Sequence, residues 1–159
     1  MITPDLLRHY TFFEFLKSNQ LKAVAKIARE ESFESGDIIF RENDHADWLY
    51  ILVKGSVDLF FTIEVEYHPE LRKELLFGTI NPGELFGISA LIEPHILTSS
   101  ARTSKPCQVM EIEAASLLEL CNKDERLAYG LVRQVAKSCM ERINATRLQL
   151  AAAWSTMYS

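Results

Sequence analysis

The middle of the chain, residues 33–112, consists of short runs of β-branched and aromatic residues separated by turn residues. Runs of this kind, bounded by Gly, Pro, Asn and Asp, are typical of β-strands. Several short strands at close spacing fold into a sandwich or a barrel. We therefore expect a mainly β core. The clearest strands are predicted at Asp37–Phe40, Leu49–Val53, Ser56–Thr62, Glu74–Gly78 and Gln108–Ile112.

Helical periodicity flanks this segment on both sides. Residues 1–32 carry apolar side chains at spacings of three and four, which predicts N-terminal helices with a cap at Ser18 or Asn19 between them. Residues 114–159 are helical again and open with a capping box at residues 116–119, Ser-Leu-Leu-Glu. A longer helix is predicted from about Asp124 to about Met157.

This long helix carries an apolar seam of small and medium side chains that alternate spacings of four and three, the a/d pattern of a coiled coil. One interpretation is that the seam packs on the strands of the same chain. However, a periodic stretch of about 30 residues would be roughly 45 Å long, which exceeds a compact domain of this size. We therefore favour a homodimer formed through residues 131–153. The seam residues are Val132, Ala136, Cys139, Ile143, Thr146, Leu150 and Ala153.

Composition and charge narrow the class of protein. A chain of 159 residues fits a single domain. It has 17 basic and 22 acidic side chains, and the net charge of −5 has the wrong sign for a domain that neutralises phosphates, so no direct nucleic-acid binding is expected. The longest apolar run, residues 48–53, is far shorter than a membrane span, and the chain does not open with a signal pattern. We expect a cytoplasmic protein that does not bind membranes.

Metal binding and catalysis find little support in the sequence. Cys107, Cys121 and Cys139 lack the spacing of zinc or iron–sulfur ligands and are interpreted as small buried residues. The four histidines lie near turns without the spacing of a cupin metal site, and only His95 is kept as a candidate ligand contact or haem ligand. Nucleophile-elbow, phosphate-loop and His-Glu-x-x-His motifs are all missing. We expect no metal and no enzyme activity.

Three segments together resemble a known family. Glu34–Asp44, followed by Trp48–Val57, resembles the opening strands of a cyclic-nucleotide-binding domain. Residues 81–87, Asn-Pro-Gly-Glu-Leu-Phe-Gly, resemble the turn into that family's phosphate-binding cassette, and residues 101–112 resemble the strand pair that leaves it. Asn43 stands where the family usually has another glycine, and asparagine is the residue next most able to adopt a left-handed conformation. Five of the six glycines match family positions: Gly36, Gly55, Gly78, Gly83 and Gly87.

The resemblance covers nearly the whole chain and implies its fold. It implies a mainly β protein with flanking helices, in which residues 33–113 form a double-stranded β-helix, or jelly roll. N-terminal helices would occupy residues 1–32, and residues 114–159 would end in a long dimerisation helix. Together these form one cyclic-nucleotide-binding-like domain, 1–159, with a cassette-like segment at 83–100, as in bacterial catabolite-activator-type sensors.

The cassette departs from the family at two charged positions. The family's ribose-binding glutamate and phosphate-binding arginine correspond here to Ile88 and Leu97. A charge-assisted hydrogen bond contributes about 1.5–3 kcal/mol and a bidentate arginine makes two, so losing the arginine should weaken cyclic-nucleotide binding about 100-fold or more. Arg102 lies further along the strand and is expected to be an ordinary solvated arginine. The candidate ligand-binding residues are Phe86, Gly87, Ile88, Ser89, Ala90, Leu97, Thr98 and Ser99.

Three classes of function stay open. The leading hypothesis is a non-enzymatic, dimeric sensor that binds cAMP or cGMP weakly, or binds another small anionic ligand at the amides of residues 87–90, and signals to a downstream protein. The second is an interaction or scaffold domain whose vestigial pocket is filled by Ile88, Leu91, Ile92 and Leu97. A DNA-binding regulator is disfavoured, because the charge is negative and no helix-turn-helix follows the long helix. Apolar closure of the pocket would favour the second hypothesis over the first.

Overall fold

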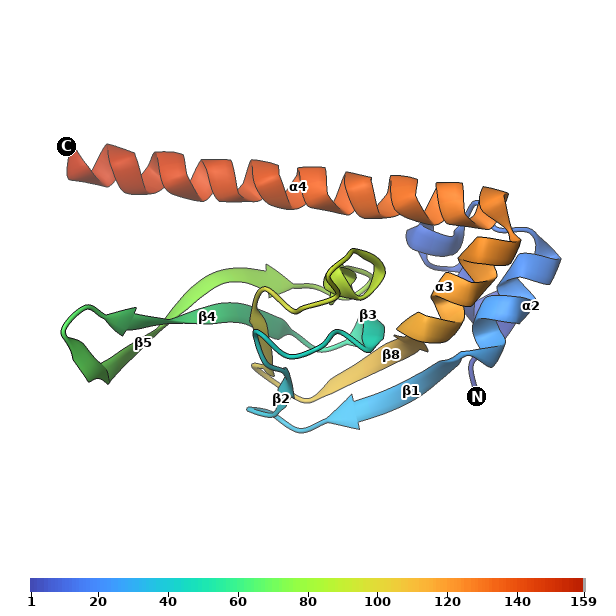
Figure 1. Ribbon diagram of the computed structural model, residues 1–159, viewed down its shortest axis with the longest axis horizontal. Coiled ribbons are helices and arrows are strands. Elements are labelled where there is room, and N and C mark those ends of the chain that lie inside the picture. Colours follow the sequence, from blue (N-terminus) through green and yellow to red (C-terminus); the bar gives the residue numbers. More distant parts are fainter. Residues whose placement is uncertain (159) are drawn as a thin grey trace.

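The computed structural model describes residues 1–158 and contains two antiparallel four-stranded sheets flanked by helices (Figure 1). The sheets have the strand orders β1-β8-β3-β6 and β2-β7-β4-β5. The predicted fold class, a mainly β jelly roll with flanking helices and a long C-terminal helix, is confirmed. The strands are β1 Ala28–Phe33, β2 Ile38–Phe40, β3 Trp48–Lys54, β4 Val57–Val65, β5 His68–Ile80, β6 Leu85–Phe86, β7 Ser100–Thr103 and β8 Cys107–Glu113. The helices are α1 Pro4–Arg8, η1 Thr11–Phe13, α2 Ser18–Lys26, η2 Ile88–Leu91, α3 Ala114–Lys123 and α4 Glu125–Met157.

The central strand β3 is buried on both faces, which explains its continuous apolar run. Successive side chains of a strand point to opposite faces. Leu49 and Ile51 pack against the helices in a cluster that we call the helix-side core. Tyr50 and Leu52 lie in a second cluster between the two sheets, which we call the roll interior. The helix-side core includes Leu7, Phe13, Leu21, Met110, Ile112, Leu127 and Leu131, and the roll interior includes Phe40, Val57, Leu59, Phe86, Ala90, Leu97, Ala101 and Val109.

The N-terminal helical segment ends earlier than the sequence predicts. Helix α2 ends at Lys26 and β1 begins at Ala28, so the prediction of helix is wrong for residues 28–32. The side chains of β1 are exposed or half-buried, and the strand is held by pairing along its whole length with β8. Backbone pairing of this kind leaves no apolar pattern in the sequence. The cap of α2 is Lys17, whose N–H donates to the Gln20 side chain at 2.9 Å, and not one of the two residues after it.

The two C-terminal helices begin at different kinds of residue. Helix α3 begins at Ala114, directly after β8, so the predicted capping box is wrong. Ser116 lies inside this helix, and its hydroxyl donates to the Glu113 carboxylate at 2.5 Å. Helix α4 begins where it is predicted, because Asp124 caps it by accepting the Leu127 N–H at 3.1 Å.

Helix α4 extends far beyond the residues that cover it. Its buried residues are Leu127, Leu131 and Val135, and every later residue described in this helix is exposed or half-buried. Figure 1 shows α4 running along the molecule and ending on the same side as the tip of the β4–β5 hairpin. No helix in residues 1–158 has the length and apolar character that a bilayer span requires. Of the seam residues, Val132, Ile143 and Leu150 are 60%, 49% and 57% exposed, Ala136 is exposed and Cys139 is half-buried.

Candidate functional site

The cassette-like segment begins with a sharp turn between β6 and η2. Gly87 makes this turn in the left-handed conformation, with φ of 69°. A Cβ atom at this position would lie 2.7 Å from Cδ2 of Tyr50, so both the backbone conformation and the close approach require glycine. Asn43, which replaces a family glycine, also has a positive φ, 70°. The left-handed conformation expected for this asparagine is therefore confirmed.

Apolar side chains fill the roll interior next to the cassette. The predicted site residues Phe86, Ala90 and Leu97 all lie in this cluster, and Leu97 is only 5% exposed. The Phe86 ring stacks on Tyr50 with 5.0 Å between centroids, and the Phe40 ring lies 6.0 Å from Phe86. Burial raises the pKa of Tyr50. The position where the resemblance predicts a phosphate-binding arginine is therefore filled by a buried apolar side chain, packed in a cluster with aromatic rings.

The remaining cassette residues are not gathered into this interior. Thr98 is exposed, whereas Ser89 and Ser99 are half-buried. Helix η2 is a single 3₁₀ turn, and the Ala90 N–H donates to the Gly87 carbonyl at 3.1 Å, so this amide is not free to meet an anion. The proposed anion site at the amides of residues 87–90 loses one of its donors in this way.

Only one of the four residues expected to fill a vestigial pocket does so. Leu97 lies in the roll interior, but Ile88 and Leu91 pack against the helix-side core and Ile92 is exposed. The reason is the 3₁₀ geometry of η2, in which side chains three residues apart share one face, so Ile88 and Leu91 both pack on the helix-side core while Ala90 enters the roll interior. The prediction that Ile88, Leu91 and Ile92 fill a vestigial pocket in the roll is therefore wrong.

The two residues considered as substitutes for the missing arginine have different environments. Arg102 is half-buried and not freely solvated: its guanidinium pairs with Glu74 at 2.8 Å and lies 4.3 Å from the centroid of the Phe60 ring. Its charge is therefore already neutralised. His95 adopts a positive φ of 60°, and its buried Nδ1 has no hydrogen-bond partner among residues 1–158. Within the same residues, no three His, Cys, Asp or Glu side chains come together as a metal site.

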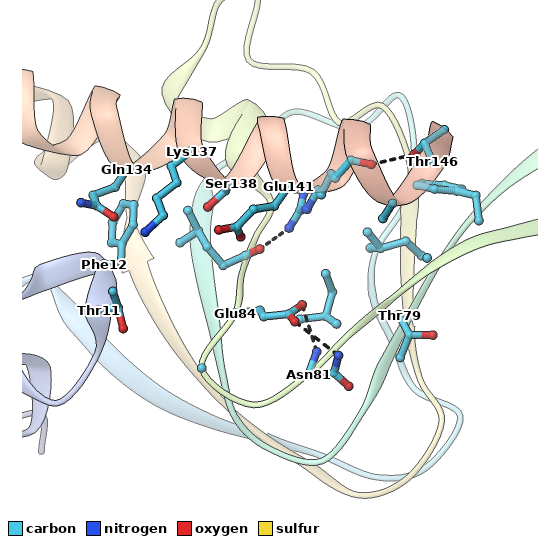
Figure 2. Close-up of a pocket in the computed structure, with 18 of the residues that line it drawn as sticks. Thr11, Phe12, Thr79, Asn81, Glu84, Gln134, Lys137, Ser138, Glu141 and Thr146 are labelled. Atoms are coloured by element: carbon cyan, nitrogen blue, oxygen red, sulfur yellow. Dashed lines mark hydrogen bonds between the residues drawn. The ribbon is translucent and has the colours of Figure 1, made fainter. Parts of the chain in front are cut away.

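A second site lies under α4, where the sequence motifs do not point. A groove of about 550 Å³ separates this helix from β4, β5 and the turn before β6 (Figure 2). Arg142 projects into it and donates to the Leu85 carbonyl of β6. Burial lowers the pKa of Arg142. Helical spacing is the sequence signal that could have located this groove. Ser138 and Arg142 continue the same face of α4, which is formed by the buried residues Leu127, Leu131 and Val135.

Comparison with known proteins identifies the family of this fold. Residues 30–124 match the model of the cyclic nucleotide-binding domain. The structure superposes on a provisionally assigned cyclic nucleotide-binding protein of Geobacter metallireducens with a TM-score of 0.79 and 38% identity, covering 90% of this chain and 99% of that one. The chain is also 24% identical over 147 residues to a CRP-like cAMP-activated global transcriptional regulator of Mycobacterium tuberculosis, covering 92% of this chain and 61% of the regulator.

A shorter similarity extends to human cGMP-dependent protein kinase 2, with 28% identity over 96 residues. It covers 60% of this chain but 12% of the kinase. The shared region is thus one domain of a much larger enzyme. The family model matches more than half of the chain, and the Geobacter metallireducens structure has the same fold. The chain belongs to the cyclic nucleotide-binding domain family.

Proposed function

We propose that this chain is a dimeric, ligand-responsive regulatory module whose roll binds cAMP and cGMP weakly or not at all. The observation that carries the proposal is the burial of Leu97 in the roll interior, at the position where the family's phosphate-binding arginine is expected. A cyclic phosphate placed there would lose its water without gaining a countercharge, which is costly. Arg102 is not suited to replace it, because its guanidinium is already paired with Glu74.

The dimer part of the proposal rests on the exposed seam of α4. Val132, Ile143 and Leu150 are about half exposed or more, although all three lie at a/d positions of the seam. A second copy of the same helix would bury all three, because a/d positions face each other in a coiled coil. Helix α4 would then carry the state of the roll to a downstream protein.

Further attributes follow from the same proposal. The module acts without catalysis, as a single domain over residues 1–159, and in the cytoplasm. Its net charge of −5 argues against direct contact with nucleic acid. The Mycobacterium tuberculosis relative is a transcriptional regulator, but the similarity covers only 61% of its length, so DNA binding is not carried over to this chain.

The filled roll also favours a second candidate, an interaction domain that has lost its ligand. Phe86, Ala90 and Leu97 would then act only as core residues that keep the fold rigid. This candidate differs from the first in one respect: no small molecule should stabilise the protein.

A thermal-shift experiment separates these candidates. A ligand at 100 times its dissociation constant adds about 2.7 kcal/mol to folding stability, which raises the Tm by several degrees. We expect cAMP and cGMP to leave the Tm unchanged, and at least one member of a panel of small carboxylates and phosphate esters to raise it. A response to no compound would favour the interaction domain, and a large response to cAMP or cGMP would reject the proposal.

A further inference from the structure

Two histidine rings lie side by side where the segment before β3 meets the end of the cassette loop. The ring centroids of His45 and His95 are 6.3 Å apart, and neither residue lines the groove under α4. A metal ion about 2.1 Å from a ring nitrogen lies about 3.2 Å from the ring centre, so two rings that share an ion are about 5–6.5 Å apart. The separation of this pair falls within that range.

Backbone hydrogen bonds hold the two histidines in place. The Ala46 N–H donates to the His95 carbonyl at 2.8 Å. The Leu97 N–H donates to the Asp44 carbonyl at 2.9 Å. These bonds form a short antiparallel ladder between two segments that are far apart in the sequence. The position of the pair is therefore set by the fold and not by loose surface side chains.

The backbone of His95 places its ring on the side of His45. In the ladder His45 lies opposite Ile96, so an extended residue next to Ile96 would point to the other face. His95 is not extended, because it adopts a left-handed conformation with φ of 60°. This conformation is strained for a residue with a side chain, and strained residues cluster at binding and catalytic sites. The strain at His95 coincides with the meeting of the two rings.

His45 has the environment of a metal ligand. Its Nδ1 lies 2.8 Å from Oδ1 of Asp47. An ionised carboxylate only accepts hydrogen bonds, so Nδ1 carries the proton and Nε2 of the neutral ring keeps a free lone pair. Histidines that bind metals almost always donate their other ring N–H in this way. The side chain is 62% exposed, so an ion can reach Nε2 from solvent.

His95 contributes a nitrogen that lacks a partner. Its Nδ1 is buried and accepts or donates no hydrogen bond among residues 1–158. A buried polar atom without a partner costs free energy. A metal ion on Nδ1 would remove this cost, and a turn of the exposed His45 ring would admit the ion. The atoms available to an ion are therefore Nε2 of His45 and Nδ1 of His95.

The kind of metal follows from the donor atoms. Imidazole nitrogens suit Zn²⁺, Cu²⁺ and Ni²⁺, whereas Mg²⁺ and Ca²⁺ prefer oxygen ligands. Within residues 1–158, no third His, Cys, Asp or Glu side chain completes a metal cluster, so water would fill the remaining positions. Such a site binds more weakly than a site with four protein ligands.

We propose that His45 and His95 bind a first-row transition-metal ion of the Zn²⁺ class, through Nε2 of His45 and Nδ1 of His95. The bound ion would link the segment before β3 to the end of the cassette loop. The inference goes beyond the proposed function and does not depend on it. It differs from the absence of metal expected from the sequence, because that expectation tested spacing along the chain and these histidines meet only across the ladder.

The experiment is a titration of the full-length, ¹⁵N-labelled protein with ZnCl₂, followed by the imidazole ¹⁵N shifts. We expect saturable shifts at Nε2 of His45 and Nδ1 of His95 at micromolar Zn²⁺. MgCl₂ should shift neither nitrogen, although the chain carries a net charge of −5. Equal responses to Zn²⁺ and Mg²⁺, or no saturable shift at either of the two rings, would overturn the inference.

His68 is a matched control within the same chain. Its Nδ1 lies 3.0 Å from Oε1 of Glu70 and its side chain is 59% exposed, so it has the same carboxylate contact as His45. Among the ring contacts of residues 1–158, only His45 and His95 form a histidine pair. The shifts of His68 should therefore not saturate at micromolar Zn²⁺.

Three substitutions test the pair by calorimetry with ZnCl₂. His45→Gln and His95→Asn should each weaken Zn²⁺ binding at least about tenfold, since losing even an outer contact of a metal ligand costs 10–100-fold. Asparagine also adopts left-handed conformations, so it suits position 95. His68→Gln should leave the affinity unchanged. Equal losses for His45→Gln and His68→Gln would contradict the pair. If His95→Asn fails to fold, His45→Gln and the wild-type shifts still decide the inference.

Discussion

The Ile143→Lys variant is expected to sediment as a folded monomer at micromolar concentrations at which the wild-type protein is a dimer. Ile143 is 49% exposed in the single chain, so a lysine is tolerated there without loss of the fold. In the dimer the same position would face the seam of the partner helix, where an ammonium group has no countercharge. An uncompensated buried charge costs about 3–5 kcal/mol, which is a loss of more than 100-fold in dimer affinity.

Leu148→Lys is the matched control for this experiment. Like Ile143, Leu148 is an exposed apolar residue of α4, but it lies at the f position of the heptad, opposite the seam. Sedimentation velocity should show a dimer for this variant. A monomeric wild-type protein, or equal dissociation of both variants, would rule out the seam as the dimer contact.

Replacing Leu97 with arginine is expected to lower the free energy of unfolding by about 3–5 kcal/mol, because the guanidinium would enter an apolar interior without a partner. Leu97 packs among Phe40, Tyr50 and Phe86, and the glutamate expected near it in the family is replaced by Ile88, which packs elsewhere. Urea denaturation followed by circular dichroism measures the change directly.

The control for Leu97→Arg is Leu97→Met, which keeps the volume and apolar character of the side chain and should cost less than about 1.5 kcal/mol. A Leu97→Arg variant as stable as the methionine variant would mean that the roll interior has room for a hydrated charge. The roll would then be able to hold a polar ligand.

The sequence predicts the parts of this structure that follow a regular apolar period. The strand predicted at Leu49–Val53 and the start of α4 near Asp124 both follow from local patterns, and both are found. Strand β1 is not predicted, because most of its side chains are polar and it is held by pairing with β8 rather than by an apolar face of its own. Its existence depends on a strand some 80 positions later in the chain, as in the pair Arg29 and Glu111, which are 82 residues apart.

The two candidate sites also differ in how far the sequence predicts them. A turn motif and Gly87 mark the cassette-like segment in the sequence, and the resemblance alone predicts that Leu97 replaces a charged residue. What sequence could not supply is where Ile88 points, which depends on the 3₁₀ geometry of η2. The groove is harder still, because Arg142 and Leu85 are 57 positions apart and meet only when α4 lies across the roll.

Isothermal titration calorimetry of cAMP and cGMP against the wild-type protein tests the central claim most directly. The claim is that the roll interior, closed by Leu97 and Phe86, does not hold a cyclic nucleotide with high affinity. The predicted result is no saturable heat at micromolar nucleotide concentrations. A dissociation constant in the micromolar range or tighter for either nucleotide would contradict it.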